Sequence, residues 1–135
     1  MRKYRRPIQV IYVTLVAISI WFIGPVLAGG GDPVIAKQAW PMIDQGALLI
    51  DVRTAEEFAA GHITGAINIP WQETDKLMDA IGPDLQRQVV VYCRSGNRST
   101  VYCNKLRKQG FESVYNLKGG VLAWQRAELP LTKTG

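Results

Sequence analysis

The stretch that most constrains the fold leads from an apolar strand, through a short polar loop, into a helix. Residues 89–92 are three valines and a tyrosine, a continuous apolar run typical of a buried strand. From Ser99 onward apolar side chains recur at helical spacing, and Gly110 is a typical helix stop. A strand followed directly by a helix is the repeating unit of parallel sheets, so this stretch predicts an α/β fold.

The rest of the chain repeats the alternation. Four further runs predict strands, at residues 33–35, 47–52, 66–69 and 114–117. Helical patterns fall between them, at residues 36–45, 54–60 and 71–81, after Ser99, and after the glycine pair at 119–120. The strands are continuously apolar rather than alternating, which favours burial on both faces. We therefore expect a central parallel β-sheet of about five strands flanked by helices on both faces.

Basic charge is concentrated at the amino terminus. The net charge is +5, yet without residues 1–28 the chain carries 12 Lys and Arg against 11 Asp and Glu. This distribution argues against nucleic-acid binding. A basic start, an apolar run and small residues around Ala28 predict a signal peptide over residues 1–28, and hence a periplasmic protein. The alternative is an uncleaved inner-membrane anchor at residues 8–27, facing the periplasm. We expect a linker at 29–33 and one domain at 34–131.

Cys93 lies in the polar loop, at the predicted carboxyl end of its strand and just before its helix. A thiolate there is stabilised by the helix N-terminus, by inward-facing backbone N–H groups and by nearby guanidinium groups. The same loop suits a small anion, because ligands of parallel sheets bind at this end of the strands. Cys103 falls about one turn into the helix, which favours packing against the sheet over a disulfide with Cys93.

Three segments, in this order, resemble the motifs of the rhodanese domain family. They read DVRTAEEFAAGHITGAINIP at 51–70, CRSGNRS at 93–99 and NLKGGVLAW at 116–124. Together they span most of the chain after residue 28, and the chain is similar to the small exported rhodaneses of the phage-shock type. The resemblance implies a rhodanese-like fold and a thiosulfate sulfurtransferase that forms a persulfide on Cys93.

The resemblance also implies partners and site residues. The sulfur donor is expected to be thiosulfate or a related small anion, and the acceptor cyanide or a thiol, with no metal and no organic cofactor. The loop is expected to bind the substrate through its N–H groups and its two guanidinium groups. The residues concerned are Arg94, Ser95, Gly96, Asn97, Arg98 and Ser99.

Three other residues are expected to support the site. Asp51 and Arg53 follow a predicted strand, and we expect them to pair with each other or with nearby backbone. His62, the only histidine, lies in a Gly-His-Ile turn, and a structural hydrogen bond there is favoured over a general-base role.

Two other functions remain open. A phosphatase or arsenate reductase of related fold needs a Cys-x5-Arg loop, whereas four residues separate Cys93 from Arg98 here. A sulfur carrier or binding module that serves a partner protein would use the same residues as the enzyme, so the sequence does not separate the two.

Overall fold

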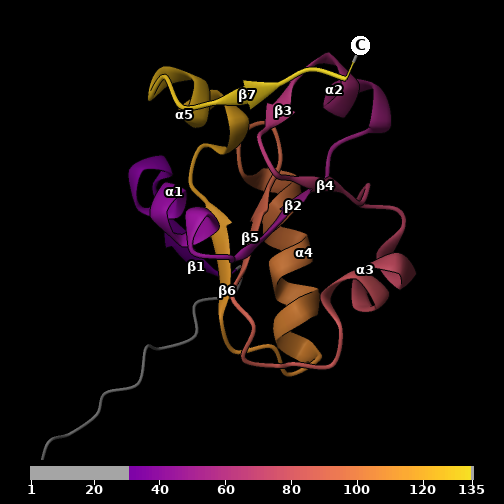
Figure 1. The fold of residues 1–135 in the computed structure, drawn as a ribbon. Helices are drawn as coiled ribbons and strands as arrows, with labels where there is room; N and C mark the ends of the chain where they lie inside the picture. Colours follow the sequence, from indigo (N-terminus) through magenta and orange to yellow (C-terminus); the bar gives the residue numbers. More distant parts are fainter. Residues whose placement is uncertain (1–30, 135) are drawn as a thin grey trace, which may run out of the picture.

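Five short segments pair as parallel strands in the computed structural model, which describes residues 31–134 (Figure 1). The sheet order is β1-β6-β5-β2-β4, so the strand that precedes Cys93 lies in the middle. The strands are β1 (Asp32–Val34), β2 (Leu48–Asp51), β4 (Ile67–Asn68), β5 (Val89–Tyr92) and β6 (Val114–Leu117). The predicted parallel sheet of five strands is confirmed.

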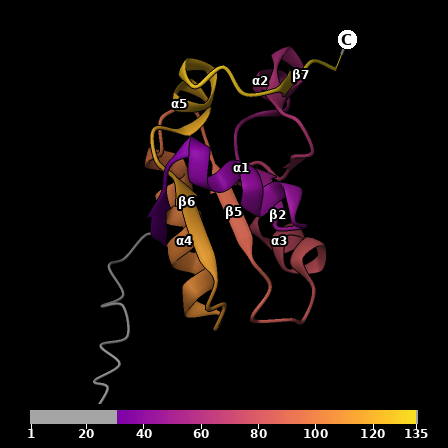
Figure 2. The same cartoon turned by 60° about the vertical axis from the view of Figure 1, so that its left-hand side comes forward.

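Helices cover both faces of this sheet, as predicted (Figure 2). The helices are α1 (Ala36–Asp44), α2 (Ala55–Ala60), α3 (Thr74–Ile81), α4 (Asn97–Lys108) and α5 (Gly120–Arg126). Side chains of α3 and α4 pack on one face, and side chains of α1 and α5 pack on the other. The short helix α2 lies at the end of the sheet, against β3.

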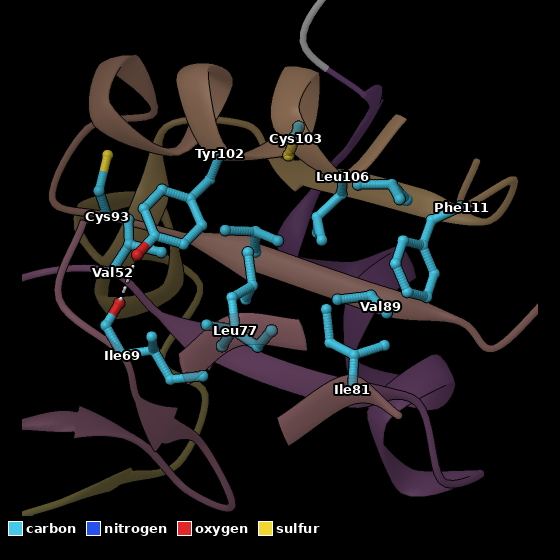
Figure 3. Packing of buried hydrophobic residues seen from close by; sticks show 13 residues of the cluster. Val52, Ile69, Leu77, Ile81, Val89, Cys93, Tyr102, Cys103, Leu106 and Phe111 are labelled. Carbon is cyan, nitrogen blue, oxygen red and sulfur yellow. Dashed lines mark hydrogen bonds between the residues drawn. The ribbon is translucent and has the colours of Figure 1, made fainter. Parts of the chain in front are cut away.

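Neighbouring residues of β5 supply both halves of the core, because successive side chains of a strand point to opposite faces. Val89 and Val91 belong to the cluster beneath α3 and α4, whereas Val90 and Tyr92 belong to the cluster beneath α1 and α5. Figure 3 shows the first cluster, in which Tyr102 reaches across to the Ile69 carbonyl. All four side chains of β5 are fully buried, so both faces of the sheet contribute to the hydrophobic core.

Two predicted boundaries need correction. Strand β1 runs from Asp32 to Val34, one residue earlier than the predicted strand at 33–35, and therefore begins within the segment assigned above to the linker. Asp32 pairs in register with Tyr115, and its carboxylate lies 3.2 Å from the Arg107 guanidinium. Helix α3 begins at Thr74 rather than at residue 71, because the preceding residues form a turn closed by a 2.8 Å hydrogen bond from the Glu73 N–H to the Pro70 carbonyl.

A second sheet of two antiparallel strands was not predicted. It pairs β3 (His62–Ile63) with β7 (Leu131–Thr132). Strands of two residues are too short to show periodicity, so sequence patterns do not reveal them. The predicted signal peptide lies outside the described residues. Within residues 31–134, no helix is long and apolar enough to cross a bilayer.

Candidate functional site

The candidate site lies where the central strand meets helix α4. Cys93 follows β5 directly, and α4 begins four residues later at Asn97. Gly96 is the N-cap of that helix and has a φ of 107°, a left-handed conformation that glycine adopts without steric cost. The chain can therefore turn sharply from strand to helix, which places Cys93 at the predicted carboxyl end of the strand and beside the helix N-terminus.

Hydrogen-bond donors surround the sulfur of Cys93. The Gly96 N–H donates to Sγ at 3.1 Å, and the Ser99 hydroxyl oxygen lies 3.5 Å from Sγ. Burial alone would raise the pKa of the Cys93 thiol, but the Ser99 hydroxyl and the N–H groups of Ser99, Gly96 and Ser95 outweigh it. The net effect lowers the pKa of Cys93 below its ordinary value, which favours a reactive thiolate.

Helix α5 fixes the direction in which the loop's peptide groups point. The Cys93 carbonyl accepts a hydrogen bond from the Val121 N–H at 2.9 Å, and the Arg94 carbonyl accepts one from the Leu122 N–H at 3.2 Å. Both carbonyls are thus held against the start of α5, while loop N–H groups lie on the sulfur. Gly120 makes this contact possible, because a Cβ there would overlap the Cys93 carbonyl oxygen. The sequence motif contained Gly120 but did not reveal this role.

The two arginines of the loop differ in their surroundings. Arg94 is exposed, like Ser95 and Asn97. Arg98 instead forms a two-bond ion pair with Glu57 of α2, with both N–O distances at 2.9 Å. The pair lowers the pKa of Glu57 chiefly through its hydrogen bonds. The expectation that both guanidinium groups attract an anion stays a prediction, and a carboxylate already compensates the charge of Arg98.

Asp51 and Arg53 form the expected pair at the end of β2. The Arg53 guanidinium lies 2.7 Å from the Asp51 carboxylate, and both residues are buried. Burial would lower the pKa of Arg53, but its bonds to Asp51 raise that pKa on balance. Arg53 also donates to the Gly61 carbonyl at 2.7 Å, and Asn68 donates to the carbonyls of both paired residues. This network braces the strand next to β5.

His62 makes the kind of local hydrogen bond that the sequence predicts for it. Its ring stacks on Phe58 with 3.6 Å between ring centroids, and its Nδ1 lies 2.9 Å from the Phe58 carbonyl oxygen. Within residues 31–134, no hydrogen bond joins His62 to Cys93. The geometry therefore gives no support to a Cys–His dyad.

Asn116 is a residue of the site that the sequence analysis missed. It lies in β6, the strand next to β5, and its side chain accepts a hydrogen bond from the Ser99 hydroxyl at 2.7 Å. A polar side chain in a strand buried on both faces needs a hydrogen-bond partner. The asparagine within the predicted apolar strand at 114–117 was therefore the sequence feature that could have identified it. Glu57 was missed as the partner of Arg98, because 41 positions separate the two residues in sequence.

A shallow depression of about 340 Å³ adjoins the loop. It is lined by Trp71, Asn97, Arg98 and Val101. Trp71 is 46% exposed and Val101 is 53% exposed, so apolar surface lies beside the candidate site.

Cys103 is a buried free thiol in the core beneath α4, as predicted, and no disulfide joins it to Cys93. Among residues 31–134, no three or more His, Cys, Asp or Glu side chains gather in a way that would hold a metal ion.

Comparisons with known proteins agree with this fold. A family model described as "Rhodanese-like domain" matches residues 35–127. A protein named "Sulfurtransferase" from Allochromatium vinosum is 45% identical over 84 residues, 62% of this chain and 77% of its own. "Thiosulfate sulfurtransferase GlpE" from Haemophilus influenzae is 36% identical over 73% of this chain and 91% of its own. The solved rhodanese-like domain of the Anabaena protein Alr3790 is 27% identical, with a TM-score of 0.66 over 75% of this chain and 78% of its own.

Proposed function

The chain belongs to the rhodanese-like domain family, and on that premise we propose that it is a sulfurtransferase whose nucleophile is Cys93. Two relatives named as sulfurtransferases support the transfer reaction, and one of them is named for thiosulfate. The loop geometry supports the nucleophile. We propose thiosulfate or a related small anion as the donor, and cyanide or a thiol as the acceptor.

In the first step, the Cys93 thiolate attacks the outer sulfur of thiosulfate. A bond forms between Sγ and that sulfur, the S–S bond of thiosulfate breaks, and sulfite leaves with the bonding electron pair. The products are a Cys93 persulfide and sulfite. A preformed thiolate is required, because the neutral thiol is a poor nucleophile.

In the second step, the acceptor attacks the outer sulfur of the persulfide. Cyanide gives thiocyanate and a thiol acceptor gives a new persulfide, and both restore the Cys93 thiolate. The N–H groups that stabilise Sγ also stabilise the negative charge that returns to it. Exposed Arg94 is the guanidinium that we propose attracts the anionic donor, since Glu57 already pairs with Arg98.

The observation that carries this proposal is the bonding of Sγ within its loop. A backbone N–H at 3.1 Å and a hydroxyl oxygen at 3.5 Å lie against one buried sulfur, and the pKa of Cys93 is lowered despite burial. The other cysteine lacks this arrangement, and burial raises its pKa to about 12. This difference supports Cys93, rather than Cys103, as the proposed nucleophile.

Intact mass spectrometry tests the proposal. The reduced protein is treated with thiosulfate, and cyanide is added afterwards. We expect a mass gain of one sulfur atom that cyanide reverses, because a persulfide on an activated thiolate turns over with both reagents.

Two variants make the test specific. Cys93→Ser is expected to abolish the mass gain, whereas Cys103→Ser is expected to retain it. A folded, reduced protein that gains no mass would overturn thiosulfate as donor and leave a carrier role. A gain that persists in Cys93→Ser would overturn Cys93 as nucleophile.

We further propose that the protein acts in the periplasm. The basic, apolar and small-residue pattern of residues 1–28 supports export, with an anchor at residues 8–27 as the alternative. Cell fractionation with N-terminal sequencing separates these outcomes. A mature chain that begins near residue 29 in the periplasmic fraction is expected, a membrane-bound chain that retains residues 8–27 would indicate the anchor, and a cytoplasmic chain would overturn export.

A further inference from the structure

The Ser99 hydroxyl has one proton and three acceptors within reach. Its oxygen lies 2.7 Å from Asn116 Oδ1, 3.0 Å from the Gly96 carbonyl oxygen and 3.5 Å from Cys93 Sγ. A hydroxyl donates only one hydrogen bond at a time, so these three acceptors compete for it. Ser99 is fully buried, and its proton is therefore held within this group of atoms.

The orientation of the Asn116 amide is fixed by its other contacts. Its Nδ2 lies 3.4 Å from the Gly96 carbonyl oxygen and 3.0 Å from the Thr100 hydroxyl oxygen. The Gly96 carbonyl can only accept, and the Thr100 hydroxyl donates to it at 2.8 Å. The amide nitrogen must therefore face these two groups, and the amide oxygen must face Ser99. Oδ1 cannot donate, so the 2.7 Å contact uses the Ser99 proton.

We propose that Asn116 is a positioning residue that holds the Ser99 proton away from Cys93 until the sulfur carries negative charge. The inference deepens the proposed function, because it rests on Cys93 as the nucleophile. In the thiol form, Ser99 donates to Oδ1 and is free to accept from the Cys93 S–H. In the thiolate form, Ser99 donates to Sγ instead.

The switch needs no redox partner. When the S–H bond breaks, its proton passes to water and its electron pair stays on Sγ. The Ser99 O–H then rotates from Asn116 Oδ1 to Sγ, and no O–H bond breaks. Oδ1 loses one hydrogen bond and the thiolate gains one, so Asn116 competes with the thiolate for a stabilising donor.

Neutral substitutions at Ser99 and Asn116 add no charge to the charged and titratable groups around the loop and remove none from them. The loop itself carries an exposed guanidinium, α4 carries a second guanidinium and, further along the helix, a buried thiol, and α2 and β2 each present a carboxylate. These groups are Arg94, Arg98, Cys103, Glu57 and Asp51. An effect of the neutral variants on the reactivity of Cys93 is therefore assignable to the hydroxyl proton.

The test measures the rate at which iodoacetamide alkylates Cys93 in the reduced full chain, from pH 5 to pH 10. Replacing Asn116 by alanine removes the nearest competing acceptor and leaves the Gly96 carbonyl, 3.0 Å from the hydroxyl, as the weaker competitor. On the acidic side of the profile we expect Asn116→Ala to react about fivefold faster, the factor that corresponds to one ordinary hydrogen bond. No sulfur donor is present, so a failure here is distinct from a failure of the sulfur-transfer experiment.

A double-mutant cycle separates this role from a general loosening of the site. With Ser99→Ala as background, Asn116→Ala is expected to leave the rate unchanged, and with Ser99→Thr the acceleration should return. Equal acceleration in the Ser99→Ala background, or no acceleration in the native background, would overturn the proposal. Asn104→Ala, an asparagine of α4 outside the loop, is the control and is expected to react at the native rate.

Asn116→Asp provides the second variant if Asn116→Ala fails to fold, which the absence of a cooperative unfolding transition would show. A carboxylate is a stronger acceptor than an amide and should hold the Ser99 proton more tightly, so alkylation slows. The added charge also slows alkylation by itself. The proposal therefore requires a greater slowing with Ser99 than with Ser99→Ala, and equal slowing in the two backgrounds would overturn it.

Discussion

At the scale of the residue, two buried cysteines differ in the direction in which the fold moves the pKa of the thiol. Burial raises the pKa of Cys103 from the ordinary value of 9.0 to about 12, and the nearby Arg107 offsets only part of this effect. Cys93 is also buried, but the donors on its sulfur lower its pKa. The difference arises from what each sulfur contacts: apolar core for Cys103, and N–H and hydroxyl groups for Cys93.

This contrast predicts selective alkylation. At pH 7, limiting iodoacetamide should modify the native protein once, at Cys93, and peptide mapping checks the position. Cys103 should react only after denaturation, because its thiol is both neutral and fully buried in the native state. Comparable modification of both cysteines in the folded protein would contradict this assignment.

At the scale of the element, the start of helix α5 completes the loop that belongs to β5 and α4. Its first N–H groups would otherwise lack partners, and two of them bind the carbonyls of Cys93 and Arg94. The backbone of Gly120 lies so close to those carbonyls that no side chain fits there. The glycine pair at the start of α5 is therefore part of the candidate site as well as a helix start.

The close approach predicts a large effect of Gly120→Ala. The new Cβ would overlap the Cys93 carbonyl oxygen, so the loop must move, and a displacement of about 1 Å lowers rates by about 100-fold. We expect persulfide formation by thiosulfate to fall by at least tenfold, measured by the rate of the mass gain. The free energy of unfolding should fall by several kcal/mol, on the order expected for overpacking together with backbone strain.

Gly46→Ala is the matched control. Gly46 also has a positive φ, 100°, but nothing lies within 4 Å of a Cβ placed there. It should lose about 1 kcal/mol of stability from backbone strain alone and keep the native rate of persulfide formation. Equal effects of the two substitutions on that rate would argue against the role assigned to the start of α5.

At the scale of the whole molecule, ionisable side chains buried between the sheet and α4 make the stability of the fold depend on pH in the alkaline range. Cys103 and Tyr102 both lie in this layer, and burial raises the pKa of each to about 12. The unfolded chain ionises these groups at lower pH, near 9 for the thiol and near 10 for the phenol. Above those values the unfolded state binds fewer protons than the native state, so stability falls as the pH rises.

Urea unfolding between pH 7 and pH 11 checks this prediction. Below pH 9 this contribution to the free energy of unfolding should be constant. Above it, each group should lower the free energy by about 1.4 kcal/mol per pH unit until its native pKa is approached. Cys103→Val should show a slope shallower by the contribution of one group, because Tyr102 and the buried Tyr92, whose pKa is also raised by burial, remain. A slope equal to that of the native chain would contradict the contribution of Cys103.

The fold class and the position of the candidate nucleophile were open to prediction because they depend on neighbours in sequence. Apolar runs, helix spacing and turn residues identified the five parallel strands, and the strand-loop-helix stretch placed Cys93 at the edge where such sheets bind ligands. The pair of Asp51 and Arg53 also lies within three residues, and it forms as expected.

What tertiary structure alone decided are the contacts between elements that are distant in sequence. Glu57, 41 positions away, compensates the charge of Arg98. Asn116, 17 positions away, accepts the hydrogen bond of the Ser99 hydroxyl. Strand β7 pairs with β3 across almost 70 residues. Local patterns carry no information on such pairs, because folding onto one sheet brings them together. The sequence determined where the candidate cysteine lies and which loop groups bind its sulfur, and the packing of distant elements determined the partners of Arg98 and Ser99.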